Sequence, residues 1–524
     1  MKRLERPNWR KKSEWQKKFW LVLLCVFLLI PLTVGGYFLG GNLIAESKLI
    51  VNGATIFVRA GGDLQSALDR AKSGDTIVLQ AGANFVGSFT LPNKAGNEFI
   101  TIQSSELAKL PKDGVRVSPQ DAAQMPKILS SGGGIPAIKT APNAHHYRFV
   151  GIEFAPNGAD YVYNLIALGS DSQKAEEMPK NFEIDRCYIH PNPKGKTRRG
   201  IMLNSADTVI KNSYISGFAY REEETQGIAG WNGSGGYKII NNYIEAGAEN
   251  ILFGGSDPSI KNLVPTDIEI RNNLMSKPAE WRGKVTIKCT FELKNARNVR
   301  VIGNIIENSF DENAVRLTIR NQDGTAPWSV IEDVLFQNNI VRNSGGGVNF
   351  LGKDDLYPSA VMKRVQVVNN LFENIDSQKF GGDGRFVVVS HGEDITVANN
   401  TVFHNGNVIT AHGDASKKFV FRNNIFSNNA YGFAGEGVIG KGVFAKYLSD
   451  STVSDNVIVN GKSIPKSEIY VPPRNALVDG FDAVGFVGWQ AGNYRLAPNS
   501  KFKDKKIGCD IDALETEIRK VQKK

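Results

Sequence analysis

The sequence predicts an all-β chain that winds into a solenoid of stacked parallel strands. Three observations favour this architecture. A motif of one or two asparagines between short apolar runs recurs along the chain, its period is roughly thirty residues, and no repeat holds a long segment with helical periodicity. A repeat with two or three short β-branched runs can wind once around an axis and stack its strands on the next coil.

The asparagine motif marks the same point in each repeat, as in "VQVVNNLFENI" at residues 365–375. Asparagine is unfavourable inside a strand and favourable in a turn, so we expect a corner there. Side-chain amides at equivalent corners can hydrogen-bond from coil to coil. The second position of the motif is Asn242, Asn273, Asn304, Asn339, Asn370, Asn400, Asn424 and Asn456, and two earlier copies carry Cys187 and Ser213.

Short helices are expected at both ends of the solenoid. Asp63 is suited to cap a helix and Gly74 to end it, which predicts a capping helix at residues 63–73 over the open end of the first coil. At the other end, residues 501–524 are expected to form either a closing helix or a charged tail. The helix is favoured because apolar residues recur at helical spacing, at Ile511, Leu514, Ile518 and Val521.

The N-terminal segment predicts a membrane anchor. Residues 19–40 hold no charge, and as a helix they would span about 33 Å, enough to cross a hydrocarbon core of ~30 Å. Residues 1–18 hold eight Lys or Arg and two Glu, which predicts that this segment stays in the cytoplasm. The β-helix domain, residues 41–500, is then expected to lie outside the cytoplasm, in the periplasm or at the cell surface. A cleaved signal peptide is the alternative, but the apolar run is long and no A-x-A site follows it.

The charge distribution argues against nucleic acid as a partner. The chain carries a formal net charge of +10, of which residues 1–18 give +6 and residues 501–524 give +3, so the solenoid is close to neutral. A nucleic-acid-binding domain needs a basic face of its own. Cys187, Cys289 and Cys509 lie far apart and have no metal-ligand spacing.

The repeats, their corners and the capping helix resemble a right-handed, single-stranded parallel β-helix of the pectate-lyase-like superfamily, over roughly residues 51–500. The resemblance implies about twelve coils, and it implies a polysaccharide ligand lying along one face, where polar residues of successive coils align. Such a fold hosts many functions, so a non-catalytic glycan-binding protein and a structural surface protein both remain open.

Two coils resemble alginate-lyase and chondroitinase-B-like polysaccharide lyases more closely, "FELKNARNVRVIGN" and "VRLTIRNQDG". This resemblance implies β-elimination on a uronate polymer, with Lys294 as base and Arg320 as acid, and a Ca²⁺ ion could bind nearby. A lysine among cations has a lowered pKa and can act as a base. The carboxylates that hold calcium in that family are missing from "VTIKCTF", and only Glu292 is near. A structural role for both residues is the alternative.

A second set of residues resembles polygalacturonase-type glycoside hydrolases, in which one carboxyl group acts as acid and another as base. These are Asp354 and Asp355, with His391 on the next coil. Aromatic and amide side chains in or near the loops could bind sugar rings, although a Trp could equally cover an edge of the solenoid. The expected substrate-binding residues are Trp231, Asn232, Trp281, Trp328 and His412.

Overall fold

The computed structural model describes residues 53–460 and 465–521, which belong to one compact unit, Asn52–Lys524. The basic segment 1–18 and the predicted signal anchor 19–40 lie outside the described residues. Within the described ranges, no helix is long and apolar enough to cross a membrane.

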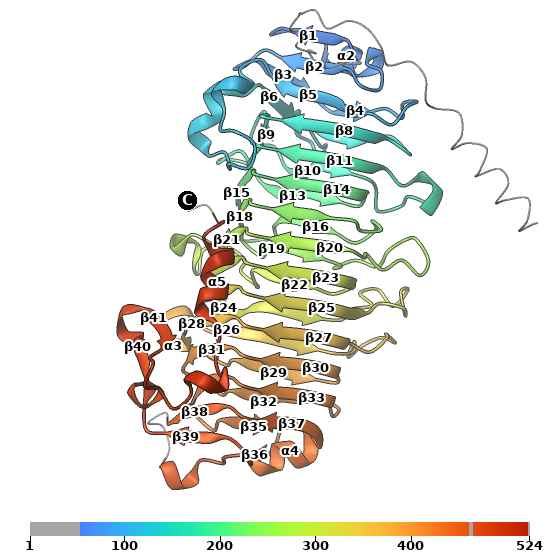
Figure 1. Cartoon of the computed structure of the whole chain (residues 1–524). Helices are drawn as coiled ribbons and strands as arrows, with labels where there is room; N and C mark the ends of the chain where they lie inside the picture. The colour runs from blue at the N-terminus through green and yellow to red at the C-terminus, as the bar shows by residue number, and fades with distance from the viewer. Residues whose placement is uncertain (1–52, 461–464, 522–524) are drawn as a thin grey trace, which may run out of the picture. The chain divides into compact units, whose positions relative to one another are not determined.

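The strands stack in three parallel columns, and the chain visits the columns in a fixed order on each coil (Figure 1). Their bounds are as follows. The first column contains β1 (Thr55–Val58), β2 (Thr76–Leu79), β5 (Ile100–Ser104), β8 (His145–Val150), β11 (Lys180–Asp185), β14 (Ala206–Lys211), β17 (Lys238–Ile240), β20 (Ile268–Arg271), β23 (Ala296–Ile302), β25 (Ile331–Gln337), β27 (Lys363–Val368), β30 (Glu393–Ala398), β33 (Lys417–Arg422) and β37 (Asp450–Ser454). The second contains β3 (Asn84–Gly87), β6 (Lys127–Ser130), β9 (Glu153–Pro156), β12 (Tyr188–Ile189), β15 (Tyr214–Phe218), β18 (Tyr243–Ala246), β21 (Leu274–Ser276), the first parts of β24 (Ile305–Thr318) and β26 (Ile340–Leu351), β28 (Leu371–Ile375), β31 (Thr401–His404), β34 (Ile425–Asn428), β38 (Val457–Asn460) and β39 (Ala476–Val478).

The third column contains β4 (Phe89–Leu91), β7 (Ile138–Thr140), β10 (Val162–Leu168), β13 (Thr197–Leu203), β16 (Gln226–Gly230), β19 (Glu249–Phe253), β22 (Phe291–Leu293), the second parts of β24 and β26, β29 (Val387–Ser390), β32 (Ile409–Ala411) and β35 (Phe433–Gly435). The remaining strands are antiparallel, β36 (Val438–Ile439) beside β35 and β40 (Phe486–Gly488) beside β41 (Asn493–Leu496). The helices are α2 (Leu64–Arg70), α3 (Ser377–Phe380), α4 (Lys441–Tyr447) and α5 (Ile511–Ile518), with 3₁₀ turns η1 (Leu107–Lys109), η2 (Pro119–Gln124), η3 (Ala175–Glu177), η4 (Ala279–Trp281), η5 (Lys466–Glu468), η6 (Phe481–Val484), η7 (Trp489–Ala491) and η8 (Lys503–Lys505).

The first column holds 14 strands, of which β1 and β37 belong to incomplete turns at the two ends. The complete coils therefore agree with the number expected from the repeats. Identical inward positions of successive coils stack on one another and fill the hollow of the solenoid with apolar side chains. One such stack in the first column is Ile239, Ile270, Val301, Phe336, Val367, Val397 and Phe421.

The corner between the first and second columns is a continuous amide ladder, as the sequence predicts. Each asparagine accepts hydrogen bonds, through its Oδ1, from the backbone N–H and the Nδ2 of the asparagine one coil before, as Asn370 does from Asn339 at 2.9 and 3.1 Å. The residue that precedes each ladder asparagine has a positive φ, such as +55° at Asn338, which explains the paired Asn-Asn. The ladder also reaches Asn475, which the repeats did not reveal.

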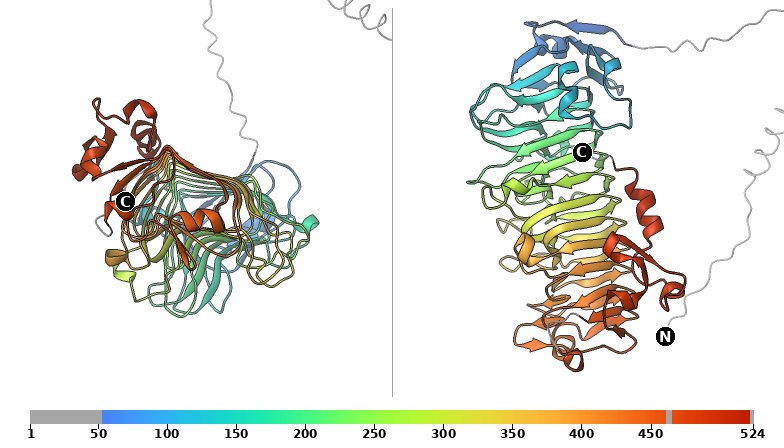
Figure 2. Two further views of the ribbon diagram at one scale, coloured as in Figure 1. Left: turned by 90° about the horizontal axis from the view of Figure 1, so that it is seen from below. Right: turned by 90° about the vertical axis from the view of Figure 1, so that its left-hand side faces the viewer.

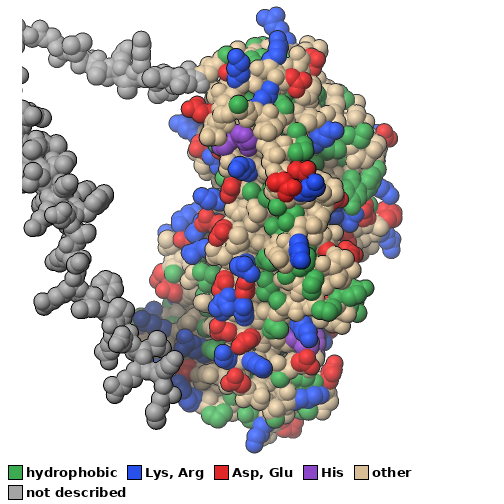
Figure 3. Space-filling view, turned by 90° about the vertical axis from the view of Figure 1, so that its right-hand side faces the viewer, with side chains coloured by type: hydrophobic (Ala, Val, Ile, Leu, Met, Phe, Trp, Pro, Cys, Tyr) green, Lys and Arg blue, Asp and Glu red, His purple; other side chains and the backbone are tan. Residues whose placement is uncertain are grey.

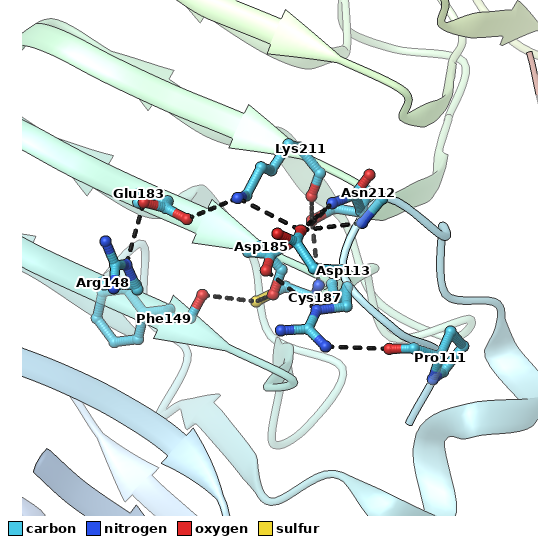
Figure 4. A network of polar contacts seen from close by, with 12 residues as sticks. Pro111, Asp113, Arg148, Phe149, Glu183, Asp185, Cys187, Lys211 and Asn212 are labelled. Carbon is cyan, nitrogen blue, oxygen red and sulfur yellow. Dashed lines mark hydrogen bonds and ion pairs between the residues drawn. The ribbon is translucent and has the colours of Figure 1, made fainter. Parts of the chain in front are cut away.

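At its N-terminal end the ladder passes to Ser213 and Cys187. Beside these residues lies a network of polar contacts that includes Asp113, Asp185 and Asn212 (Figure 4). Asn212 donates to Asp185 at 2.9 Å and to Asp113 at 3.2 Å. Since Asp113 belongs to a loop between β5 and β6, these contacts fasten that loop to the side of the solenoid. Cys187 is buried and free, which confirms its place in the corner column.

The two ends differ from the expectation in two respects. A helix, α2, lies next to the first coil with Asp63 as its N-cap, and it is shorter than the expected 63–73. At the other end α4 covers the last coils, burying Val443 and Tyr447 in the main core (Figure 2). The expected C-terminal helix forms as α5, but it does not close the end.

Instead, the C-terminal segment folds back along the corner (Figure 1). The backbone N–H of Gly508 donates to the carbonyl of Asn423, that of Asp510 donates to the Oδ1 of Asn369, and the Nδ2 of Asn272 donates to the carbonyl of Glu517. Leu514 packs on Leu371 in a small apolar cluster. The polar groups of the positive-φ column thus anchor this segment, a feature that helical spacing alone could not predict.

Candidate functional site

Two adjoining hollows of about 370 and 320 Å³ lie where strands of the third column end and turn into loops. Three cationic residues line both hollows, Lys288, Lys294 and Arg320. We refer to the two hollows together as the central groove. On the face of the molecule drawn in Figure 3, acidic and basic side chains are interspersed.

The groove brings together the two residues expected to carry β-elimination. Lys294 directly follows β22 and Arg320 follows β24 on the next coil, and the backbone N–H of Arg320 donates to the carbonyl of Lys294 at 3.1 Å. The two side chains therefore leave the solenoid one rung apart, a spacing of about 4.8 Å. This proximity is what the sequence predicts, while the catalytic roles stay predictions.

Lys294 has the environment of a potential base. Only 9% of the residue is exposed, and burial lowers the pKa of its amine, with the charge of Lys288 acting in the same direction. The charges of Glu292, Glu249 and Glu224 oppose this effect but do not cancel it. A larger fraction of the Lys294 amine is therefore neutral near physiological pH than for an ordinary lysine.

Arg320 is held by the loop that follows β26. Its guanidinium lies 3.4 Å from Asp354 and also forms an ion pair with Asp355. Asp354 is buried and accepts backbone hydrogen bonds from Asn321 and Leu356, so it organises the two neighbouring loops. Both carboxylates of the hydrolase alternative are thus engaged with the same arginine.

The floor of the groove contains a buried charge cluster around Lys288. Its ammonium lies 3.0 Å from Glu249, 3.2 Å from Glu292 and 3.6 Å from Glu224. The carboxylates of Glu249 and Glu292 are almost completely buried and come from adjacent coils. Burial by itself would lower the pKa of Lys288, but the three carboxylates outweigh it and raise that pKa far above its usual value.

The first hollow also has a cationic and aromatic rim, of which the sequence predicts Trp231 but neither Arg198 nor Arg199. Arg199 lies over the rings of Trp231 and Tyr163, 4.8 and 5.1 Å from their centroids, and Arg198 donates to the Tyr163 hydroxyl at 2.7 Å. The Nε of Arg199 is buried and has no hydrogen-bond partner among the described residues. Arg199 pairs in register with Gln226 on the next coil, a relationship that irregular loop lengths hide in the sequence.

The other predicted site residues do not all reach the groove. Trp231 and His412 line it, and burial lowers the pKa of His412. Asn232 is fully buried. Its side-chain amide donates to Ser170 in one neighbouring loop and to Ser259 in another, and it accepts from the backbone N–H of Ile260. These contacts give Asn232 a structural role.

Trp281, Trp328 and His391 line neither of the two hollows. Trp328 donates to the carbonyl of Leu263 at 3.0 Å and covers an edge of the solenoid. His391 lies 3.1 Å from Asp414, outside the groove that holds Asp354 and Asp355. Of the residues in the hydrolase alternative, Asp354 and Asp355 therefore line the groove, where both are paired with Arg320, and His391 does not line it.

The residues near Lys294 are poorly suited to a calcium ion. Ligand atoms of Glu249, Cys289 and Glu292 lie within 4.8 Å of one another, but Ca²⁺ takes six to eight oxygen ligands and a thiol supplies none. Burial raises the pKa of the Cys289 thiol well above its usual value, so it stays protonated. The ammonium of Lys288 already contacts both carboxylates, and it would repel a cation placed between them.

Comparisons with known proteins bear on the fold. The model of a family described as a right handed beta helix region matches residues 289–490. No curated protein matches the sequence. An arginine-to-alanine variant of the PL6 family alginate lyase AlyGC is similar, with a TM-score of 0.52 and 14% identity, covering 90% of this chain and 58% of that one. This chain thus spans little more than half the length of that enzyme.

Two further solved structures are similar at a lower level. A PL6 family polysaccharide lyase from Pseudopedobacter saltans has a TM-score of 0.45 and 12% identity, covering 86% of this chain and 98% of that one. Pectate lyase Pel9A has a TM-score of 0.35 and 13% identity, covering 86% of this chain and 90% of that one. The stacked columns, the family match over residues 289–490 and the AlyGC superposition together show that the chain has the fold of a right-handed parallel β-helix.

Proposed function

We propose that the chain is a polysaccharide lyase that cleaves a uronate polymer by β-elimination in the central groove. The observation that carries this proposal is the placement of Lys294 and Arg320 on hydrogen-bonded neighbouring rungs, in a groove that both side chains line. The alginate lyase AlyGC has the same fold, which supports the proposal.

The residues of the groove can supply each step. The neutral amine of Lys294 removes the proton at C5 of the uronate, and the electron pair of that C–H bond forms the double bond between C4 and C5 as the C4–O4 bond breaks. Arg320, one rung away, donates a proton to the departing O4. Cations beside the uronate carboxylate stabilise the charge that develops, and Arg199 at the rim is placed to contribute.

The test is to incubate the purified chain with alginate, polygalacturonate and hyaluronan, and to follow the ultraviolet absorbance of the unsaturated product. Formation of that product on any of the polymers, and its loss in Lys294→Ala and Arg320→Ala, would support the proposal. A panel without product, or unchanged activity in both variants, would overturn it. Lys139→Ala, which alters an exposed lysine, is the matched control.

A non-catalytic glycan-binding groove is the second candidate, because Arg320 is already paired with Asp354 and Asp355. This candidate predicts saturable binding of the same polymers, measured by calorimetry, with no unsaturated product. A glycoside hydrolase would instead release reducing ends without the absorbance change.

We further propose that residues 19–40 anchor the protein in a membrane, with the β-helix outside the cytoplasm. The support is the uncharged apolar run and the basic segment that precedes it. Protease added to spheroplasts, in which both the periplasmic and the outer faces are accessible, would digest the β-helix if this orientation holds. Recovery of the chain in the soluble fraction would contradict the anchor.

A further inference from the structure

The Lys288 cluster is the least expected feature of the groove, because it places an ammonium where two buried carboxylates face each other. Glu249 opens β19 and Glu292 lies in β22 on the next coil, so the solenoid itself fixes their separation. Lys288 reaches both from the loop that leads into β22. Its side chain is 19% exposed, whereas those of Glu249 and Glu292 are 0% and 2% exposed.

The two carboxylates depend on this ammonium. The Oε1 of Glu249 and the Oε2 of Glu292, which face Lys288, accept no other hydrogen bond within the described parts of the chain. Their second oxygens are bound by neutral donors, from Gln226 to Glu249 at 2.8 Å and from Thr318 to Glu292 at 2.9 Å. Among the described residues, Lys288 is the only cation within 4.0 Å of either carboxylate, although Lys294 and Arg316 also interact electrostatically with Glu292. Without Lys288, the two buried carboxylates would lose their direct ion pair, which is unfavourable.

We propose that Lys288 is the built-in cation of the groove: its ammonium holds the place between Glu249 and Glu292 that a divalent metal would otherwise take, so that the site is assembled without a metal. The contacts of Lys288 with Glu249 and Glu292 support the assembly of the site without a metal. The consequence for catalysis, metal-independent cleavage of a uronate polymer, rests on the proposed function.

Lys288 lines both hollows, so its side chain forms part of the floor of the groove. A metal at this position would fix the floor of the groove only when it is bound. A lysine of the chain fixes it permanently and keeps a positive group next to Lys294, where it helps to hold that amine neutral.

The test compares the purified chain with variants of Lys288, Glu249 and Glu292, by thermal unfolding in EDTA and in CaCl₂. We expect the Tm of the wild-type chain to be the same in both. Lys288→Ala is expected to have a Tm several degrees lower in EDTA and to recover part of the loss in CaCl₂, because the vacated carboxylates bind the ion. Lys288→Arg keeps the charge and is expected to behave like the wild type.

The double variant Lys288→Ala/Glu249→Gln removes one carboxylate and is expected to lose the response to CaCl₂. A wild-type Tm that rises in CaCl₂ or falls in EDTA would overturn the proposal, and so would a Lys288→Ala variant without a response to calcium. If Lys288→Ala does not fold, Lys288→Ala/Glu249→Gln/Glu292→Gln is expected to restore folding, and its failure to do so would also overturn the proposal.

Activity serves as a separate readout. If the chain cleaves a uronate polymer, EDTA is expected to leave the initial rate unchanged, and inhibition by EDTA would contradict metal independence. If no polymer is cleaved, the proposed function fails, while the unfolding experiment still decides whether Lys288 is the internal cation.

Discussion

Asn304 and Asn339 lie 35 residues apart in the sequence, yet the backbone N–H and the Nδ2 of Asn304 both donate to the Oδ1 of Asn339, at 2.9 and 3.0 Å. The Nδ2 of Asn339 in turn donates to the carbonyl of Val301 at 2.9 Å and to the next asparagine of the ladder. Each amide therefore connects three coils. The ladder fixes the register of the solenoid at a corner where the strand hydrogen bonds stop.

Replacing Asn339 by Ala is expected to lower the free energy of unfolding by about 3–5 kcal/mol, because several buried donors and acceptors lose their partners together. Urea unfolding followed by circular dichroism measures the change. The matched control is Asn338→Gly one residue earlier, where φ is +55° and glycine is tolerated. It removes only one part-buried side-chain hydrogen bond, donated by Asn369 at 2.6 Å, and is expected to cost about 1 kcal/mol. Equal costs for the two variants would contradict the ladder's role.

The repeats predict the ladder because the corner imposes a local requirement, a positive φ followed by a buried amide, at every coil. The groove lacks such a repeating requirement. Lys294 and Arg320 could be paired from the sequence, because two successive repeats resemble those of alginate-lyase and chondroitinase-B-like polysaccharide lyases. Lys288 and Arg199 could not, because their positions depend on the lengths of the loops between strands and on the register of coils far apart in sequence.

The C-terminal segment shows the same limit. Its helical spacing predicts α5, but the place where α5 docks is set by amides of the corner, such as Asn272 and Asn369. These side chains look like ordinary turn residues in the sequence. Only the stacked structure shows that they form a row that can hold a second segment of chain.

A buried lysine next to the groove is expected to be essential for the local structure. The Nζ of Lys277 donates to the carbonyls of Ala246 and Gly247 at 2.7 and 2.8 Å and to the Oδ1 of Asn250 at 2.9 Å. These groups belong to the turn that carries Glu249 into the cluster around Lys288. The turn and the floor of the groove are therefore coupled through one ammonium group.

Lys277→Met is expected to destabilise the protein by about 3–5 kcal/mol, since the acceptors of the turn lose a common donor in a buried site. Urea unfolding measures this loss. Lys238→Met, at an exposed lysine of β17, is the control and is expected to change stability by less than about 0.5 kcal/mol. A Lys277→Met variant as stable as this control would show that the turn does not depend on the ammonium.

The pH dependence of cleavage is expected to follow Lys294. A base must be unprotonated, so kcat/KM is expected to rise with pH and to level off below the ordinary lysine pKa of 10.5, since burial lowers the pKa of this amine. Lys294→Ala is expected to lower kcat by about 10²-fold or more and to remove this limb of the profile. Initial rates across a pH series measure both effects, and a rising limb that persists in Lys294→Ala would assign the base to another residue.

His404 is expected to make the β-helix sensitive to acid. Burial, opposed only by backbone hydrogen bonds, lowers its pKa from 6.5 to about 4. Because the folded-state pKa lies below the unfolded-state value, the contribution of His404 to stability is complete above pH 6.5 and is lost as the pH falls through 4. Over this pH range, the protein would lose about 3 kcal/mol of its free energy of unfolding through His404. In His404→Gln, the free energy of unfolding between these pH values should decline less steeply than in the wild type. Parallel pH curves for wild type and His404→Gln would assign the acid sensitivity to other groups.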